Sequence, residues 1–146
     1  MSTYGARAEQ NFREGCNCAQ AVLLAFANVT GFDDAVASKL GEPFGAGMGQ
    51  LREVCGAFTG ALMVLGMADG SPDPRDRTAR RELYGKVQQL GEEFKSRHGS
   101  LVCGELLGLR TPPGAFEKLP RKQPCPILVR TTADMLAEML ELHADS

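Results

Sequence analysis

Five cysteines are the residues of this chain whose type best suits chemistry: Cys16, Cys18, Cys55, Cys103 and Cys125. A cysteine thiolate is both a nucleophile and a soft metal ligand, so a set of thiols can hold a metal or a cluster or form a reversible disulfide. Cys16 and Cys18 are spaced Cys-x-Cys, which is neither the thioredoxin-like nor the compact zinc-ribbon signature. Spacing alone therefore leaves iron–sulfur, disulfide and zinc chemistry open.

Other reactive constellations have less support in the sequence. The loop Gly45-Ala46-Gly47-Met48-Gly49-Gln50 has glutamine where a nucleotide-binding fingerprint needs its third glycine, and no strand precedes it. No serine, histidine and acid arrangement indicates hydrolysis. His98 near the end of a predicted helix and His143 near the C-terminus are interpreted as structural residues. The thiols remain the chemistry to explain.

Composition limits the class of protein. The 146 residues suit one domain, residues 1–146, with 43% hydrophobic and 23% charged residues, as in globular proteins. A net charge of -2 argues against a nucleic-acid partner. The N-terminus lacks an apolar signal segment, and the apolar stretches 19–27 and 60–68 are too short to cross a membrane. We expect a cytosolic protein, in a compartment where structural disulfides are rare.

Helical periodicity dominates the chain, and strand signals are weak. The pattern predicts an all-α, single-domain bundle of about six or seven helices, over residues 6–14, 18–28, 33–39, 55–67, 74–98, 100–107 and from 125 onward. An irregular glycine loop is expected over 41–49, and a long proline-rich connector over 111–124. The helices 18–28 and 55–67 are apolar nearly all round, so they need cover, and a homodimer is one source of it.

Four of the cysteines share one kind of position in this pattern. Cys18, Cys55, Cys103 and Cys125 each fall in the first turn of a predicted helix. Unpaired N–H groups and the partial positive charge of a helix N-terminus favour the thiolate over the thiol. If the four helix starts converge, they suit an anionic iron–sulfur cluster held by four thiolates, and they equally suit a dithiol pair.

The residues around these cysteines carry a resemblance to a known family. They are Asn17-Cys18-Ala19-Gln20-Ala21-Val22-Leu23, Phe44-Gly45-Ala46-Gly47-Met48-Gly49, Cys55-Gly56-Ala57-Phe58-Thr59-Gly60, Cys103 and Cys125. Nearly the whole chain resembles the redox-active family named for its C…GCAxxG…C…C pattern. A related domain occurs in split-Soret cytochromes, where an iron–sulfur cluster accompanies haem. This chain has no Cys-x-x-Cys-His motif, so haem is not implied.

The resemblance implies a site made of Cys18, Cys55, Cys103 and Cys125 as reactive groups and metal ligands, with Gly56 beside the cofactor. Cys16 lies outside the pattern. The leading hypothesis is a cytosolic redox protein, a component of an oxidoreductase system, that holds an iron–sulfur cluster and exchanges electrons with a partner protein. The alternatives are a thiol–disulfide protein using the same cysteines and a zinc-binding helical module without redox activity.

Overall fold

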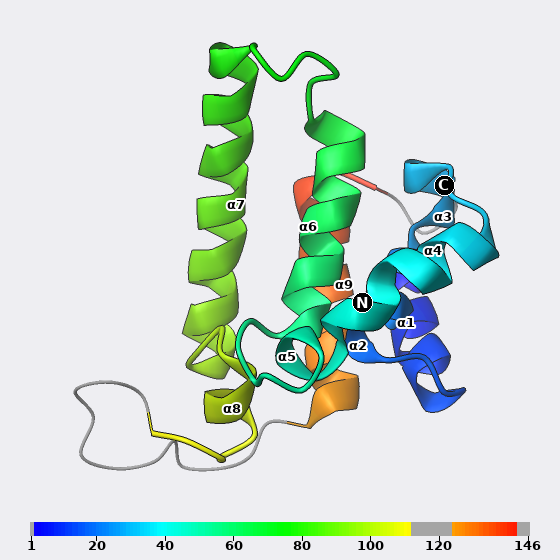
Figure 1. Ribbon diagram of the computed structural model, residues 1–146, viewed down its shortest axis with the longest axis vertical. Helices are drawn as coiled ribbons and strands as arrows, with labels where there is room; N and C mark the ends of the chain where they lie inside the picture. The colour runs from blue at the N-terminus through cyan, green and yellow to red at the C-terminus, as the bar shows by residue number, and fades with distance from the viewer. Residues whose placement is uncertain (1, 112–123, 143–146) are drawn as a thin grey trace.

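A computed structural model of the chain describes residues 2–111 and 124–142 (Figure 1). Its elements in chain order are α1 (Thr3–Arg13), α2 (Cys18–Ala25), α3 (Ala27–Thr30), α4 (Asp34–Gly41), the 3-10 turn η1 (Glu42–Phe44), α5 (Gly45–Met48), α6 (Gly56–Asp69), α7 (Arg77–His98), α8 (Cys103–Leu106) and α9 (Cys125–Met139). An isolated antiparallel bridge joins Val54 to Val102, and the described residues contain no longer strand. The predicted all-α class is confirmed.

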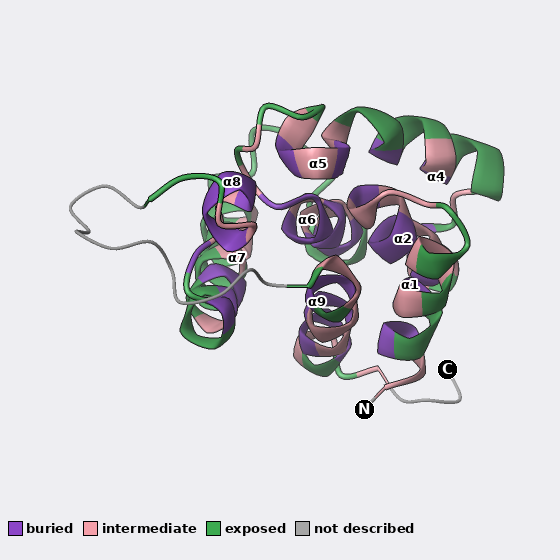
Figure 2. Cartoon of the chain, turned by 90° about the horizontal axis from the view of Figure 1, so that it is seen from below, coloured by how far each residue is buried: buried purple, intermediate pink, exposed green. Residues whose placement is uncertain are grey.

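The hydrophobic core lies between α1, α2, α6 and α9. α1 packs along both α9 and α2, and α2 packs along α6. Leu23 of α2, Leu65 of α6 and Leu136 of α9 are fully buried there. At one side of this core the rings of Tyr4 and Phe26 stack with their centroids 4.6 Å apart. Figure 2 shows the buried faces of these helices turned toward one another.

The two strongly apolar helices are covered within one chain. α2 contacts α1, α4, α6 and α9, and α6 contacts α2, α3, α7 and α9. Most residues of α2 are buried as a result: Ala19, Ala21, Val22, Leu23 and Ala25. A second copy of the chain is therefore not required to cover these two helices. The homodimer stays a prediction, but the apolar character of the helices no longer supports it.

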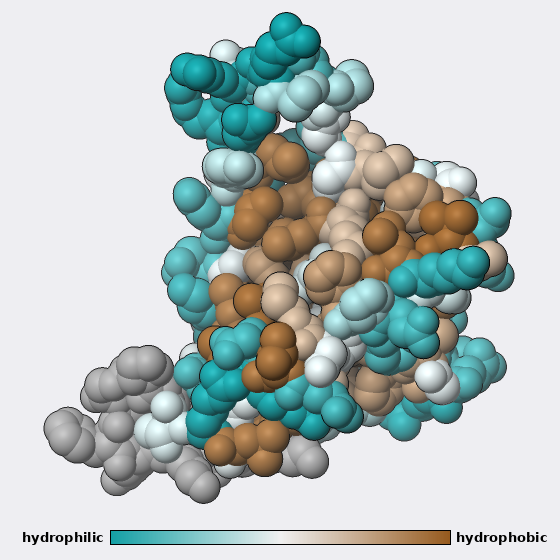
Figure 3. All heavy atoms as spheres, viewed as in Figure 1, coloured by the Kyte–Doolittle hydropathy of each residue, from teal (hydrophilic) through white to brown (hydrophobic). Residues whose placement is uncertain are grey.

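α7 is the longest helix and stands beside α6 (Figure 1). Asp76 caps its N-terminus by accepting the Ala79 N–H, and Gly99 ends it in the left-handed conformation with a φ of 93°. Only its C-terminal half is well buried, at Leu90, Gly91, Phe94 and His98. The start of α7, with the 70–76 connection before it, forms the hydrophilic projection at the top of Figure 3.

Several predicted boundaries need correction. α1 begins at Thr3 because the Ser2 hydroxyl accepts the Gly5 N–H, and the Asp134 carboxylate in turn accepts the Ser2 hydroxyl at 2.6 Å. The helix predicted over 18–28 is interrupted at Phe26, whose φ and ψ of -110° and 29° separate α2 from α3. α4 continues to Gly41 and is followed by η1 and α5, so the irregular loop predicted from residue 41 is wrong there.

The predicted proline-rich connector and the membrane question both depend on which residues the structure describes. The proline-rich connector predicted over 111–124 falls almost wholly on residues 112–123, which lie outside the described residues, as does His143. Within residues 2–111 and 124–142, no helix combines the length and the apolar character that crossing a bilayer demands.

Candidate functional site

The four cysteines predicted to act together each stand at the start of a helix. Cys18, Cys103 and Cys125 are the first residues of α2, α8 and α9, and Cys55 is the N-cap of α6. A capping box formed by Asn17 and Gln20 sets the start of α2. The predicted placement of thiols at helix N-termini is therefore confirmed, with Cys55 one position before its helix.

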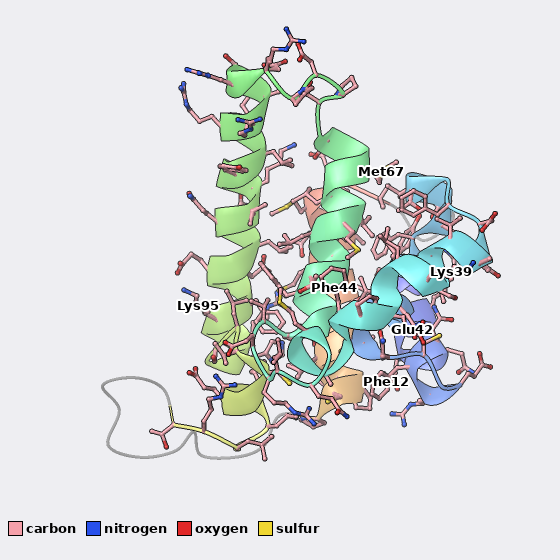
Figure 4. All side chains as sticks on the ribbon, viewed as in Figure 1. Phe12, Lys39, Glu42, Phe44, Met67 and Lys95 are labelled. Atoms are coloured by element: carbon pink, nitrogen blue, oxygen red, sulfur yellow. The ribbon has the colours of Figure 1, made fainter. Side chains whose placement is uncertain are left out.

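These helix starts meet around one cavity of about 200 Å³. All four cysteines and Gly56 line it. The remaining wall is mainly apolar and includes Phe12, Ala46, Leu106, Leu107 and Leu128. Phe12 lies at the end of the molecule where α5, α8 and the start of α9 come together (Figure 4). In Figure 2, which views the molecule from that end, α2, α5, α8 and α9 stand around α6.

A short pairing of two chain segments brings Cys55 and Cys103 next to each other. Around the Val54–Val102 bridge, the Cys55 N–H donates to the Leu101 carbonyl at 2.8 Å, and the Cys103 N–H donates to the Glu53 carbonyl at 2.5 Å. Cys55 is 5% exposed and Cys103 is 8% exposed. The bridge thus holds two of the four thiols near each other in the cavity wall, largely shielded from solvent.

Two glycines make room for the cysteine side chains. A Cβ at Gly56 would overlap Cys18 Sγ and lie 2.8 Å from the Phe44 carbonyl oxygen. A Cβ at Gly47, which has a φ of 70°, would lie 2.6 Å from Cys103 Cβ. Gly56 was predicted to lie beside a cofactor. In the structure it lines the cavity, and the Cys18 sulfur occupies the space that a Gly56 side chain would need.

The segment from residue 46 to 52 has an unusual backbone. Positive φ values occur at Ala46, Gly47, Met48, Gly49, Gln50 and Arg52. α5 is therefore a single left-handed turn, closed by the Gly49 N–H donating to the Gly45 carbonyl at 2.8 Å. Left-handed backbone costs a residue with a side chain about 1–2 kcal/mol. Such strain persists where the surrounding structure enforces it, and here it borders the cysteine cavity.

The left-handed turn yields a stability prediction. Gln50 is exposed and has a φ of 72°, so Gln50→Gly relieves strain without removing packing. We expect the free energy of unfolding to rise by about 1 kcal/mol. Gly49→Ala is the matched control, because Gly49 is also exposed with a φ of 61°, and this variant should lose stability. Chemical denaturation measures both, and a destabilised Gln50→Gly protein would contradict the prediction.

Burial dominates the electrostatics of Cys55. Desolvation raises the pKa of its thiol from 9.0 to about 12, and the neighbouring Cys18 and Cys103 add to that rise. The backbone N–H groups of Phe58 and Ala57, at the start of α6, act in the opposite direction. The donors at the start of α6 thus favour the Cys55 thiolate as expected, but desolvation outweighs them, so the metal-free thiol keeps its proton more tightly than a free cysteine does.

This raised pKa predicts a loss of stability at alkaline pH. Between pH 9 and about 12 the folded metal-free protein keeps the Cys55 proton that the unfolded chain releases. The folded state then binds more protons, so the free energy of unfolding falls as pH rises, by up to about 1.4 kcal/mol per pH unit. Urea denaturation from pH 8 to 10.5 measures the slope. Cys55→Ser should show a shallower slope, and an equal slope in both proteins would refute the assignment.

Arg52 is a cavity residue that sequence reasoning missed. Its side chain lines the cavity, and its Nη1 donates to Cys103 Sγ at 3.7 Å. The available signal was one basic residue between the glycine loop and Cys55, three positions before that cysteine. Cys16 is placed differently: it is half-buried and does not line the cavity, in agreement with its place outside the family pattern.

The state of the thiols bears on what the site can hold. None of the five cysteines, all of which lie in the described ranges, is part of a disulfide. Within those ranges, no three or more side chains of His, Cys, Asp and Glu gather closely enough to share a single metal ion. The four thiols border a cavity rather than meet at a point, which suits a polynuclear group with its own volume.

Comparison with known proteins gives one match. No curated protein and no solved structure matches the chain. The family model described as "Putative redox-active protein (C_GCAxxG_C_C)" matches residues 16–139, a range that contains every cysteine and all the described residues of the cavity except Phe12. The match spans most of the 146 residues. The chain therefore belongs to the C_GCAxxG_C_C family of redox-active proteins.

Proposed function

We propose that the four cysteines hold an iron–sulfur cluster and that the protein exchanges electrons with a redox partner protein. The observation that carries this proposal is the convergence of Cys18, Cys55, Cys103 and Cys125 on one largely apolar cavity of about 200 Å³. Four thiolates are the usual ligand set of such clusters. In this assignment all four are ligands, and Gly56 lets the Cys18 sulfur reach its place in the wall.

The electrostatics of the cavity support an occupant that contains metal cations. Cys55 is deeply buried, and its pKa is raised further by Cys18 and Cys103, so a Cys55 thiolate is disfavoured in the empty cavity. Metal ions reverse this balance, because a coordinated thiol loses its proton outright. Iron would supply the positive charge that makes thiolates stable in this cavity, and the N–H groups of Ala57 and Phe58 would then aid the Cys55 thiolate.

The arrangement of the thiols favours a cluster over a single zinc ion. Tetrahedral zinc with bonds of about 2.3 Å draws its sulfurs to within about 3.8 Å of one another. Among the described residues, no three His, Cys, Asp or Glu side chains lie closely enough to share one metal ion, and the four thiols line a cavity. An iron–sulfur cluster places its irons and sulfides between the ligands and so spans more space. Metal analysis of the purified protein distinguishes a structural zinc site from an iron–sulfur cluster.

The decisive experiment is anaerobic reconstitution of the full chain with iron and sulfide. We expect stoichiometric iron and acid-labile sulfide, broad visible absorption, and bleaching of that absorption by a one-electron donor such as dithionite. Reconstitution with zinc serves as the comparison. A protein that takes up zinc but neither iron nor sulfide under these conditions would overturn the proposal.

A second candidate function is thiol–disulfide exchange, favoured by the bridge that holds Cys55 beside Cys103. One thiolate would attack the disulfide of a partner protein, and a second thiol would then displace the partner, so that two thiols become one disulfide as the partner disulfide becomes two thiols. With a pKa of about 12, Cys55 would be the resolving thiol and not the attacker. Identical free-thiol counts after exposure to oxidised and reduced glutathione would exclude this function.

A further inference from the structure

Arg52 is the one lysine, arginine, aspartate, glutamate or histidine among the described residues that line the cavity. Its guanidinium donates to Cys103 Sγ from Nη1 at 3.7 Å, within reach of a hydrogen bond to sulfur. Most of the surrounding wall is apolar, and charges interact more strongly there than in water. A cation in this position acts directly on the charge of the thiol group.

The backbone holds Arg52 in place from two sides. The Arg52 carbonyl accepts the Gly104 N–H at 3.0 Å, which ties it to the start of α8. The next residue, Glu53, donates its N–H to the Gly47 carbonyl at 3.0 Å, which ties the segment to the left-handed turn. Arg52 itself has a φ of 62°. A strained conformation fixed by contacts on both sides indicates that the direction of this side chain matters.

A neighbouring arginine provides the contrast. Arg110 Nη2 donates to the Leu51 carbonyl at 2.9 Å, and Nη1 pairs with the Glu53 carboxylate at 3.5 Å. Arg110 does not line the cavity. Two arginines therefore lie in the same region of the fold, and only Arg52 contacts a cysteine sulfur among the described hydrogen bonds.

We propose that Arg52 raises the reduction potential of the four-thiolate centre by donating a hydrogen bond to the Cys103 sulfur. This inference rests on the proposed function. Reduction by one electron from a viologen-class donor forms and breaks no bond and adds one negative charge, which the ligand sulfurs share. A fixed cation beside one of those sulfurs stabilises the reduced state more than the oxidised one. Arg52 is thus a positioning residue that acts through Cys103.

The first test compares reduction potentials of reconstituted proteins by equilibrium titration with viologen dyes. Arg52→Met should lower the reduced-to-oxidised ratio at the wild-type midpoint by about tenfold, which is about 59 mV for a one-electron couple. Arg52→Lys retains the charge and should shift less. Arg110→Met is the matched control and should keep the wild-type potential. An Arg52→Met protein with full iron and sulfide and an unchanged potential would overturn the inference.

The second test needs no cluster and therefore separates this inference from the proposed function. In metal-free protein at low ionic strength, peptide mass spectrometry follows alkylation of Cys103 by anionic iodoacetate and by neutral iodoacetamide. The Arg52 cation should favour the anionic reagent, so Arg52→Met should lower the ratio of the two rates several-fold, and Arg110→Met should not. An unchanged ratio in Arg52→Met would refute the Arg52–Cys103 interaction. Absence of iron in the wild-type protein would refute only the cluster.

Discussion

Replacement of Cys103 by serine is expected to lower the iron and sulfide content of the reconstituted protein by about tenfold or more. Cys103 is 8% exposed and lines the cavity with the other three thiols, and the described lining holds no further Cys and no His, Asp or Glu that could replace it as a ligand. Serine preserves the size of the side chain and removes the soft thiolate that iron prefers. The same loss is expected for Cys18→Ser, Cys55→Ser and Cys125→Ser.

The matched control for these substitutions is Cys16→Ser. Cys16 is also a cysteine near the start of α2, and it does not line the cavity. Its replacement should leave iron, sulfide and the visible spectrum at the wild-type level. Iron and sulfide assays on proteins with matched unfolding curves separate loss of a ligand from loss of the fold. A Cys103→Ser protein that keeps its full iron content would contradict the four-ligand assignment.

A methyl group at Gly56 is expected to damage both the fold and the site. The new Cβ in Gly56→Ala would overlap Cys18 Sγ and approach the Phe44 carbonyl oxygen to 2.8 Å. The sulfur can rotate away only by leaving its place in the cavity wall, and the carbonyl belongs to the backbone. We expect the free energy of unfolding to fall by about 1–3 kcal/mol, as in other overpacked sites, and the iron content to fall with it.

Gly66 provides the matched control on the same helix. A Cβ at Gly66 would meet no atom of another part of the protein within 4 Å, so Gly66→Ala adds a methyl group to open space on α6. Alanine in a helix interior is favoured over glycine by about 0.5–1 kcal/mol, so this variant should gain stability and keep its iron. Chemical denaturation and iron assays on both variants test the pair. Equal or greater stability in Gly56→Ala would show that the Cys18 sulfur does not occupy this space.

Local sequence patterns sufficed to predict the helical class and the position of four of the cysteines in the first turns of helices. Apolar periodicity and local start signals predicted Cys18, Cys103 and Cys125 in the first turns of helices, and each is the first helical residue in the structure. Only α2 of these three has a side-chain cap, and the helix predicted from residue 100 begins at Cys103. The same local reasoning was less accurate at boundaries. The break at Phe26 and the early start at Thr3 depend on packing and on the distant Asp134, which no local pattern contains.

The left-handed turn could not be predicted from local sequence, for a different reason. Glycines at 45, 47 and 49 predict irregular backbone, and they do not predict positive φ at Ala46, Met48 and Gln50. Those residues avoid such angles when isolated, so only contacts made by the folded chain can enforce them. Within this turn, Gly47 lies so close to Cys103 that an added Cβ would be 2.6 Å from the Cys103 Cβ, although the two residues are more than fifty positions apart in the chain.

The sequence by itself predicted that four thiols lie in the first turns of helices, and its resemblance to the family implied that Cys16 is separate from them. Only the tertiary structure decided that these helix starts share one cavity, that Cys55 and Cys103 are joined by a backbone bridge, and that Arg52 reaches a sulfur. It also decided the charge balance at Cys55, where burial outweighs the helix donors. Helix starts are set by neighbouring residues, whereas burial and convergence arise from the packing of segments far apart in the chain.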